Sequence, residues 1–477
     1  MTRGTFDEGF LRTLDSAACR LLAERGMSLP SPEAAGALCE LGATLDEASG
    51  TCRIPAEVLA ALLARAPRAF TLHGRDPEHD LSLGSGRCYV TNDGTGTEVL
   101  DAGAETPRPS TLEDLRRATI LSELLPSVMV SGPMVTAPSD GPSANLRDIA
   151  LCLRLCRKHI QHEVDDDAEA RALVRLLEVA ADDAGRPGCS QLSAVYCPHS
   201  PLRHPAGVLD GLVTLARARV PLMVLPMPIM GASAPTSLAA TAVQAHAEAL
   251  CSVALIQALA PGLPVIYGVG AGAMDHRTAA FSGAGPAPVA LTELLIGLGR
   301  LRSLPTCAQG FVSDAAQPGP RAVFEKAAGG EAAVAAGADL VYGIGMLGAS
   351  TVLSFEQLMI DDEIATRALW RQDRRAQLSV EESEDSVLEA ITRSQDGRYF
   401  RNRDMLRRFK RDSYSAAPHW EAHQGHEEWA EAHARVERAI ASWAPVDLSP
   451  VALAEVQRIL RASAAEGGPG AGPAASL

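Results

Sequence analysis

Aromatic, methionine and acidic side chains recur directly after short apolar runs in the middle of this chain. The set comprises Tyr196, His199, Met227, Met230, Tyr267, Asp275, Phe311, Ser313, Asp314, Tyr342, Met346, Asp361 and Asp362. A quaternary ammonium has no hydrogen to donate, so it is recognised by aromatic faces and a carboxylate, at roughly 0.5 to 2 kcal/mol per face. The set therefore predicts a pocket for a small cation. The alternative is that Tyr267 and Tyr342 only fill the interior of the fold.

Motifs for metal or nucleophilic chemistry are weak. His159, His162 and Glu163 are ligand-type residues, but their spacing matches no standard zinc motif. Cys152 and Cys156 lie one helical turn apart in an apolar stretch, where cysteine behaves as a small hydrophobic residue. The sequence contains no nucleophile elbow GxSxG and no Ser-His-Asp order. We therefore expect no metal, and we name no catalytic residue.

Eight short segments, most of them largely apolar, have the texture of parallel strands that helices cover on both faces. They are Val128–Val135, Lys158–Val164, Cys189–Tyr196, Val220–Ile229, Pro264–Gly270, Pro305–Asp314, Ala338–Gly345 and Gln357–Glu363. Stretches between them, such as residues 168–181, 236–260 and 289–304, are long enough for helices. Eight such units predict an α/β fold, a TIM (β/α)8 barrel, with its active site at the carboxyl ends of the strands.

Four parts are expected along the chain. Residues 1–110 predict an N-terminal helical and small β extension, because helical periodicity gives way to short runs and turns after Phe70. Residues 111–370 form the predicted barrel. Residues 371–463 are charged with helical periodicity and predict a C-terminal helical cap, and residues 464–477 are rich in Gly, Ala and Pro and predict a disordered tail.

Composition limits the kinds of partner that this protein is expected to bind. A formal net charge of −15 disfavours nucleic acid and anionic membrane surfaces, which bind clustered Lys and Arg. The sequence has no uncharged apolar run long enough to span a membrane. Its ten cysteines include no CxxC pair, which favours a reducing compartment. We expect a cytoplasmic homo-oligomer that binds neither nucleic acid nor membrane.

Several short signatures occur in a fixed order along the chain. They are His73–Leu81, Ser200-Pro201-Leu202, Gly231–Ser237, Ala247-Glu248, Val265–Gly268, Ser313-Asp314, Phe324-Glu325-Lys326, Ser354-Phe355-Glu356, Ile360-Asp361 and Glu363-Ile364. Together they resemble the trimethylamine methyltransferase family, which includes glycine betaine methyltransferases. The resemblance extends over about residues 6 to 445.

The resemblance implies a barrel that presents an N-methylated amine to a separate corrinoid protein, whose cobalamin Co(I) attacks the methyl carbon. The amine leaves with its electron pair, so a quaternary amine is already activated and the chain itself needs no strong nucleophile. Its contribution would be orientation and desolvation. On this interpretation the substrate is a betaine-like quaternary amine. The expected binding residues are the aromatic cage Tyr267, Phe311 and Tyr342, with Glu248, Asp275, Ser313 and Asp314 as orienting polar groups.

The chain departs from the family pattern at several places. Phe311 and Val312 stand where the trimethylamine enzymes carry pyrrolysine, which argues against trimethylamine as the substrate. Gly319 and Arg321 replace an expected Asp and Gln, and Tyr342 and Met346 replace an expected His and Trp. Either the substrate differs from glycine betaine, or the protein is a catalytically silent barrel that binds a methylamine or a corrinoid partner. A metal hydrolase would need His and Asp at several strand ends, where they are sparse.

Overall fold

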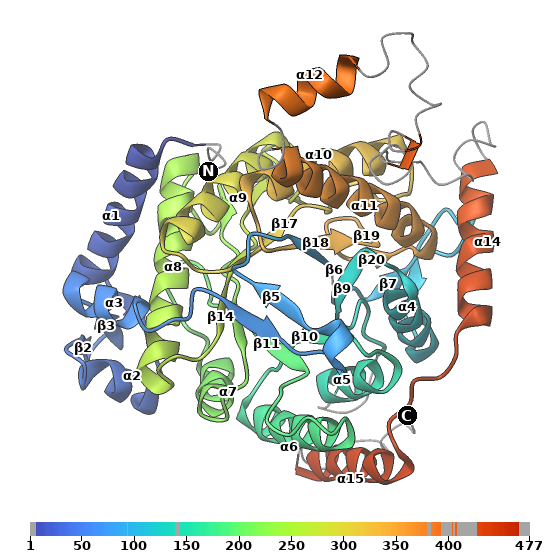
Figure 1. Ribbon diagram of the computed structural model, residues 1–477. Helices are drawn as coiled ribbons and strands as arrows, with labels where there is room; N and C mark the ends of the chain where they lie inside the picture. The colour runs from blue at the N-terminus through green and yellow to red at the C-terminus, as the bar shows by residue number, and fades with distance from the viewer. Residues whose placement is uncertain are drawn as a thin grey trace.

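The centre of the molecule is a closed barrel of eight parallel strands (Figure 1). The computed structural model describes residues 6–92, 94–138, 144–378, 383–392, 403, 406–407 and 427–466. In chain order the barrel strands are β6 (Tyr89–Asn92), β9 (Val128–Ser131), β10 (His159–Glu163), β11 (Leu192–Tyr196), β12 (Leu222–Val224), β14 (Val265–Val269), β17 (Thr306–Gln309) and β18 (Leu340–Ile344). The predicted α/β TIM-barrel fold class is confirmed.

One predicted strand is wrong. Gln357–Glu363 is not the last strand but part of the helix α11 (Phe355–Leu378). Residues 357–362 are all buried, so the segment shows no amphipathic period and has the texture of a buried strand. The eighth member of the barrel is instead β6, which the sequence assigned to the β part of the N-terminal extension. The barrel therefore begins before the boundary expected at residue 110.

Helices follow the strands and form an outer ring around the barrel (Figure 1). They are α4 (Leu112–Leu124), α5 (Ala144–Leu155), α6 (Asp167–Asp183), α7 (Ala206–Arg217), α8 (Leu238–Leu259), α9 (Pro286–Leu301), α10 (Pro320–Ala336) and α11. Capping residues mark where several of these helices begin. Thr111 and Asp114 form a capping box on α4, and Asp166 caps α6 by accepting from the Glu169 amide.

The N-terminal segment covers α8. It contains α1 (Glu8–Glu24), α2 (Pro32–Cys39) and α3 (Ala56–Leu63), with the small strands β1 (Met27–Ser28), β2 (Thr44–Asp46) and β3 (Thr51–Arg53). All three helices pack against α8. Among the described residues α8 is the one helix long and apolar enough to cross a membrane, and most of it is buried within the fold. Its all-round apolar surface is that of a core helix.

A β hairpin closes the amino-terminal end of the barrel. Strands β4 (Phe70–Leu72) and β5 (Leu81–Leu83) pair, and β5 lies across the middle of the ring of strands in Figure 1. Leu72, Leu81 and Leu83 pack with the interior side chains of the barrel strands. Arg186 binds the hairpin through Asp80 at 2.7 Å. Space inside the barrel is therefore left only at its carboxyl end.

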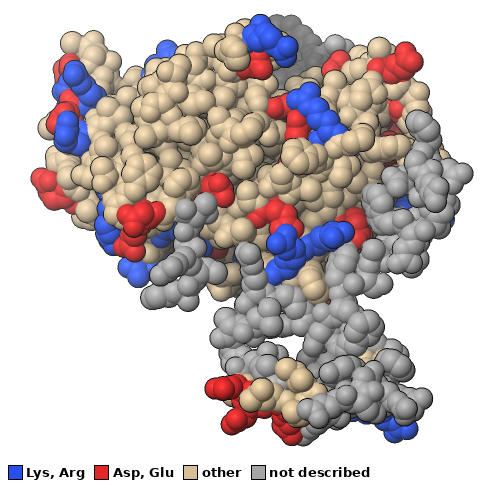
Figure 2. Space-filling model, turned by 90° about the horizontal axis from the view of Figure 1, so that it is seen from above, with Lys and Arg blue, Asp and Glu red and all other residues tan. Residues whose placement is uncertain are grey.

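Smaller elements surround that carboxyl end. One sheet contains β13 (Ile229–Met230), β15 (Gly272–Met274) and β16 (Phe281–Ser282). Another contains β7 (Glu98–Val99), β8 (Arg108–Pro109), β19 (Met346–Leu347) and β20 (Val352–Leu353). On the face seen in Figure 2, Lys and Arg side chains occur in small separate groups with acids among them.

The C-terminal part is helical where it is described. Helices α12 (Glu384–Thr392), α14 (Glu427–Ser442) and α15 (Pro450–Glu466) follow α11. Helix α14 packs on α11 and α4, and α15 packs on α6 and α5, so both lie on the outer ring. The predicted tail begins inside α15, and residues 467–477 lie outside the described residues.

A buried ion pair joins the last two barrel strands to α11. The Lys326 Nζ of α10 donates to Asp361 Oδ2 at 2.7 Å and to the carbonyls of Phe311 and Gly343 at 2.8 Å each. Asp361 also accepts from the Gly345 amide at 2.7 Å. Both charged side chains are fully buried. Every donor of the ammonium is thus used.

Replacing Lys326 with Met should lower the free energy of unfolding by about 3–5 kcal/mol, because Asp361 would remain buried without its cation. The matched control is Arg321→Gln on the same helix, which removes an ion pair whose guanidinium is largely exposed and should cost less than about 1 kcal/mol. Urea denaturation followed by circular dichroism measures both. Equal losses in the two variants would contradict the structural role of the Lys326–Asp361 pair.

Candidate active site

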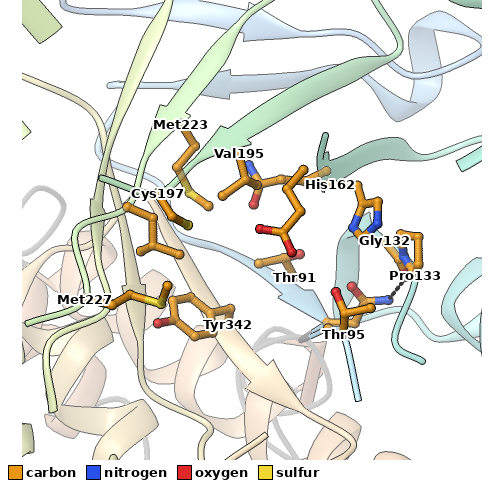
Figure 3. A pocket seen from close by; sticks show the side chains of 15 residues that line it. Thr91, Thr95, Gly132, Pro133, His162, Val195, Cys197, Met223, Met227 and Tyr342 are labelled. Carbon is orange, nitrogen blue, oxygen red and sulfur yellow. Dashed lines mark hydrogen bonds between the residues drawn. The ribbon is translucent and has the colours of Figure 1, made fainter. Parts of the chain in front are cut away.

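A cavity of about 260 Å³ lies at the carboxyl end of the barrel (Figure 3). Six barrel strands, or the turns after them, supply its wall. The lining residues are Thr91, Asn92, Gly94, Thr95, Gly132, Pro133, Gln161, His162, Glu163, Val195, Cys197, Met223, Leu225, Met227 and Tyr342. This volume is at the lower end of ligand pockets and suits a small molecule.

Glu163 is the acidic side chain among the fifteen lining residues. It ends strand β10, and the described part of the chain gives its carboxylate no hydrogen-bond or ion-pair partner. Burial raises the pKa of the Glu163 carboxyl, and the nearby Asp165 acts in the same direction. An ionised carboxylate without a partner is costly in such a setting. A cation in the cavity would supply the missing partner.

The histidine in the wall is neutral at physiological pH. His162 is buried, and burial lowers the pKa of its imidazole to about 4. Its Nε2 has no hydrogen-bond partner within the described structure. On the same strand, His159 points its Nδ1 to the His73 carbonyl at 2.8 Å. Among the described residues, no three His, Cys, Asp or Glu side chains are grouped to hold a metal ion.

The opposite wall is apolar and polarisable. Met227 and Tyr342 lie on one side of the cavity and His162 and Gly132 on the other, with Met223 above (Figure 3). The Tyr342 hydroxyl donates to the Val269 carbonyl at 3.3 Å, which fixes the ring from its far end. A ring face and thioether sulfurs attract the methyl groups of a quaternary ammonium.

Neutral polar groups complete the wall. Asn92 donates its amide to the Gly132 carbonyl at 3.0 Å and to Ser122 Oγ at 3.1 Å. Gln161 donates to Ser193 Oγ at 3.0 Å. The hydroxyl-bearing Thr91 and Thr95 lie beside them in the lining. These groups can hold a neutral polar substituent of a bound molecule.

Of the three aromatic rings expected to form a cage, Tyr342 lines the cavity and the other two do not. The Tyr267 hydroxyl bonds His246 Nδ1 at 2.8 Å, and its ring packs against Gly299 of α9. Phe311 packs against Gly330 of α10. Successive residues of a strand point to opposite faces, and Ile266, not Tyr267, faces the barrel interior. The three-ring cage therefore does not form around this cavity.

Glu248 and Asp275, two of the expected orienting groups, also lie outside the lining. Glu248 of α8 is buried and accepts from Ser200 Oγ at 2.7 Å and from the Leu202 amide at 2.9 Å, so it holds the turn after β11. Asp275 accepts from the Thr278 amide at 2.9 Å within a surface turn.

Ser313 and Asp314 serve the turn after β17. Ser313 Oγ donates to Glu325 Oε2 at 2.7 Å, and Asp314 accepts from Ser282 Oγ at 2.6 Å. Both side chains position loops around the barrel mouth and do not line the cavity.

Sequence reasoning missed Glu163, Cys197 and Met223 as lining residues. Glu163 drew attention only as part of a weak metal motif with His159 and His162. Its position as the last residue of a predicted strand was the signal that could have identified it, because such positions form the active site of a barrel.

The comparisons with known proteins agree on one family. The family model described as trimethylamine methyltransferase matches residues 3–448. A trimethylamine methyltransferase of Desulfitobacterium hafniense (strain DSM 10664 / DCB-2) is 28% identical over 375 residues, which cover 76% of this chain and 73% of that protein. A glycine betaine methyltransferase of Desulfitobacterium hafniense (strain Y51) is 24% identical over 418 residues, covering 85% and 86%.

Among solved structures, the monomethylamine methyltransferase of Methanosarcina barkeri superposes with a TM-score of 0.53 and 12% identity, covering 92% of this chain and 88% of that one. This likeness supports the barrel fold.

Replacing Glu163 with Gln should raise thermal stability at neutral pH. The folded-state pKa of Glu163 lies above its unfolded value, so its contribution to stability is fully present below about pH 4.5 and is lost as pH rises through the folded pKa. The variant should therefore gain about 1–3 °C in Tm near pH 8 and much less near pH 5.

Differential scanning fluorimetry at both pH values measures the effect. Glu178→Gln, an exposed acid on the following helix α6, makes the same chemical change and should leave Tm unaltered. A loss of stability in Glu163→Gln at both pH values would show that the carboxylate has a structural role.

Proposed function

This chain belongs to the trimethylamine methyltransferase family, and on that premise we propose that it transfers a methyl group from a quaternary amine to the Co(I) of a corrinoid carried by a separate protein. It is a methyltransferase by family. The observation that carries the amine part of the proposal is the cavity, where one unpaired carboxylate faces a tyrosine ring and methionine sulfurs.

Because of the size of the cavity, we place the amine inside it and the corrinoid outside it. A volume of about 260 Å³ has room for a small amine but not for a corrinoid macrocycle. The corrinoid, held by its own protein, would supply the nucleophile that takes the methyl group. It would have to approach from the carboxyl end, because the β4–β5 hairpin closes the other end of the barrel.

The residues of this chain would bind and orient the amine. Glu163 would balance the positive charge, and the Tyr342 ring with Met227 would contact the N-methyl groups. The departing amine keeps its electron pair, so no proton has to reach the nitrogen during transfer. The neutral state of His162 agrees with this, since no acid is needed in the wall. Holding the methyl group in one direction within a dry cavity lowers the barrier.

Trimethylamine is not the proposed substrate. The residues ahead of Ser313 are the ordinary Phe311 and Val312, and Phe311 packs against α10, away from the cavity. A tertiary amine is a poor leaving group without activation, whereas a quaternary amine needs none. Of the two charges of a betaine, the cavity supports the quaternary nitrogen. The cytoplasmic location and the homo-oligomer stay predictions from the sequence.

Replacing Tyr342 with Ala should weaken binding of a quaternary amine about tenfold or more, whereas Tyr342→Phe should change it about twofold, because the ring face makes the contact. Isothermal titration calorimetry measures both. Tyr267→Phe is the control, since that ring lies in the helix layer and its removal from the His246 bond should not change affinity. Equal losses in the Ala and Phe variants of Tyr342 would contradict the cation contact.

Methyl transfer itself is tested with the bound quaternary amine and Co(I) cobalamin. Methylcobalamin, followed by absorbance, and the tertiary amine, followed by mass spectrometry, should form in equal amounts. Binding without either product, also in the presence of a corrinoid protein from the same genome, would favour the catalytically silent barrel over the enzyme.

A further inference from the structure

We infer that the quaternary amine bound in this cavity carries no carboxylate: the substrate is a net cation with a neutral tail, of the quaternary amino alcohol or tetraalkylammonium class. This rests on the proposed function, because it narrows the substrate of the same cavity. It departs from the betaine-like amine that the sequence suggested.

The cavity wall offers no positive charge to a carboxylate on the substrate. A betaine brings a carboxylate only a few bonds from its quaternary nitrogen, and both must fit within about 260 Å³. Among the fifteen described lining residues, none is Lys or Arg, and the one acid is Glu163. His162 is buried and neutral, so it offers the carboxylate no positive charge. A bound betaine would set its carboxylate against Glu163, and like charges repel strongly in such a site.

Glu163 has no partner within the described chain, which favours a cationic ligand. Three buried acids of this fold form ion pairs, namely Asp361 with Lys326 at 2.7 Å, Glu123 with Arg157 at 2.7 Å, and Asp114 with Arg108 at 2.8 Å. Glu248 is buried without a cation, but it accepts from Ser200 Oγ and the Leu202 amide. Glu163 differs from them, since the described structure supplies no donor to its carboxylate and Asp165 adds further negative charge nearby. A half-buried carboxylate that lines a cavity and has no partner within the described chain is a natural contact for a cationic ligand.

The rest of the wall indicates what the tail of the ligand is. Thr91, Asn92, Thr95 and Gln161 bear hydroxyl and amide groups, which bond a neutral hydroxyl as well as they bond each other. In Figure 3, Thr95 lies with Gly132 and Pro133, across the cavity from Met227. The ammonium end therefore belongs between Glu163, Met227 and Tyr342, and a hydroxyl end belongs on the threonine side.

Calorimetric titration of the full-length protein with four matched compounds tests this assignment. Choline and glycine betaine differ in a hydroxymethyl against a carboxylate group, 3,3-dimethylbutanol is choline with a neutral carbon in place of nitrogen, and tetramethylammonium lacks the tail. Choline should bind at least about tenfold more tightly than glycine betaine and than 3,3-dimethylbutanol. Tetramethylammonium should also bind more tightly than glycine betaine.

The Glu163→Gln variant separates the carboxylate from the shape of the cavity. It should lose about tenfold or more in choline affinity and should no longer discriminate against glycine betaine, whereas Glu178→Gln should keep both properties. The comparison of ligands on the unaltered protein stands even where a variant fails to fold.

Different results would overturn the substrate class and the proposed function. Tighter binding of glycine betaine than of choline would overturn the inference and leave a quaternary-amine methyltransferase standing. Unchanged discrimination in folded Glu163→Gln would also overturn it. Failure of every quaternary compound to bind would overturn the proposed function together with the inference.

Discussion

The buried Lys326–Asp361 pair is the constraint on which the carboxyl end of the barrel depends. Its ammonium ties the backbone after β17, at Phe311, to the backbone of β18, at Gly343, and its carboxylate ties both to α11. Strand β18 carries Tyr342, so the pair also fixes the ring in the cavity wall. The sequence elements Phe324-Glu325-Lys326 and Ile360-Asp361 thus have a structural cause: Glu325 holds Ser313, and Lys326 meets Asp361.

Seven of the eight barrel strands could be predicted from the sequence because short runs, mostly apolar, alternate there with stretches long enough for helices, although β10 is polar at four of its five positions. Strand β6 could not, because it stands among short strands and turns before the first helix of the ring. The segment Gln357–Glu363 misled for another reason. Its apolar residues Leu358, Met359 and Ile360 are consecutive and all buried, because α11 packs against β18, α10 and α14. Its acids Asp361 and Asp362 are buried because Lys326 and the Ser127 amide bind them. That partnership is tertiary and leaves no trace in a short window.

The candidate site shows the same limit at the level of single side chains. Tyr267 lies in the middle of β14 and Phe311 just after β17. In a run that is buried on both sides, no polar residue marks which face a side chain points to. Tyr342 and Met227 were predicted at the pocket, and both line the cavity. The sequence shows Glu163 as an acid at the end of a predicted strand. It was considered only as a possible metal ligand, because His159 and His162 stand beside it. Burial keeps both histidines neutral, and of the two only His162 lines the cavity.

Asp361 and Glu163 differ in what neutralises them. Asp361 is bound within the chain by Lys326 and by the Gly345 amide. Glu163 has no such partner in the described part of the chain, so under the proposed function the cation of the substrate would be its partner. Under the proposed function, the contact with Glu163 would depend on the positive charge of the quaternary nitrogen, which the departing tertiary amine lacks until it takes up a proton. The same carboxylate would therefore hold the substrate more strongly than the product at the moment of transfer.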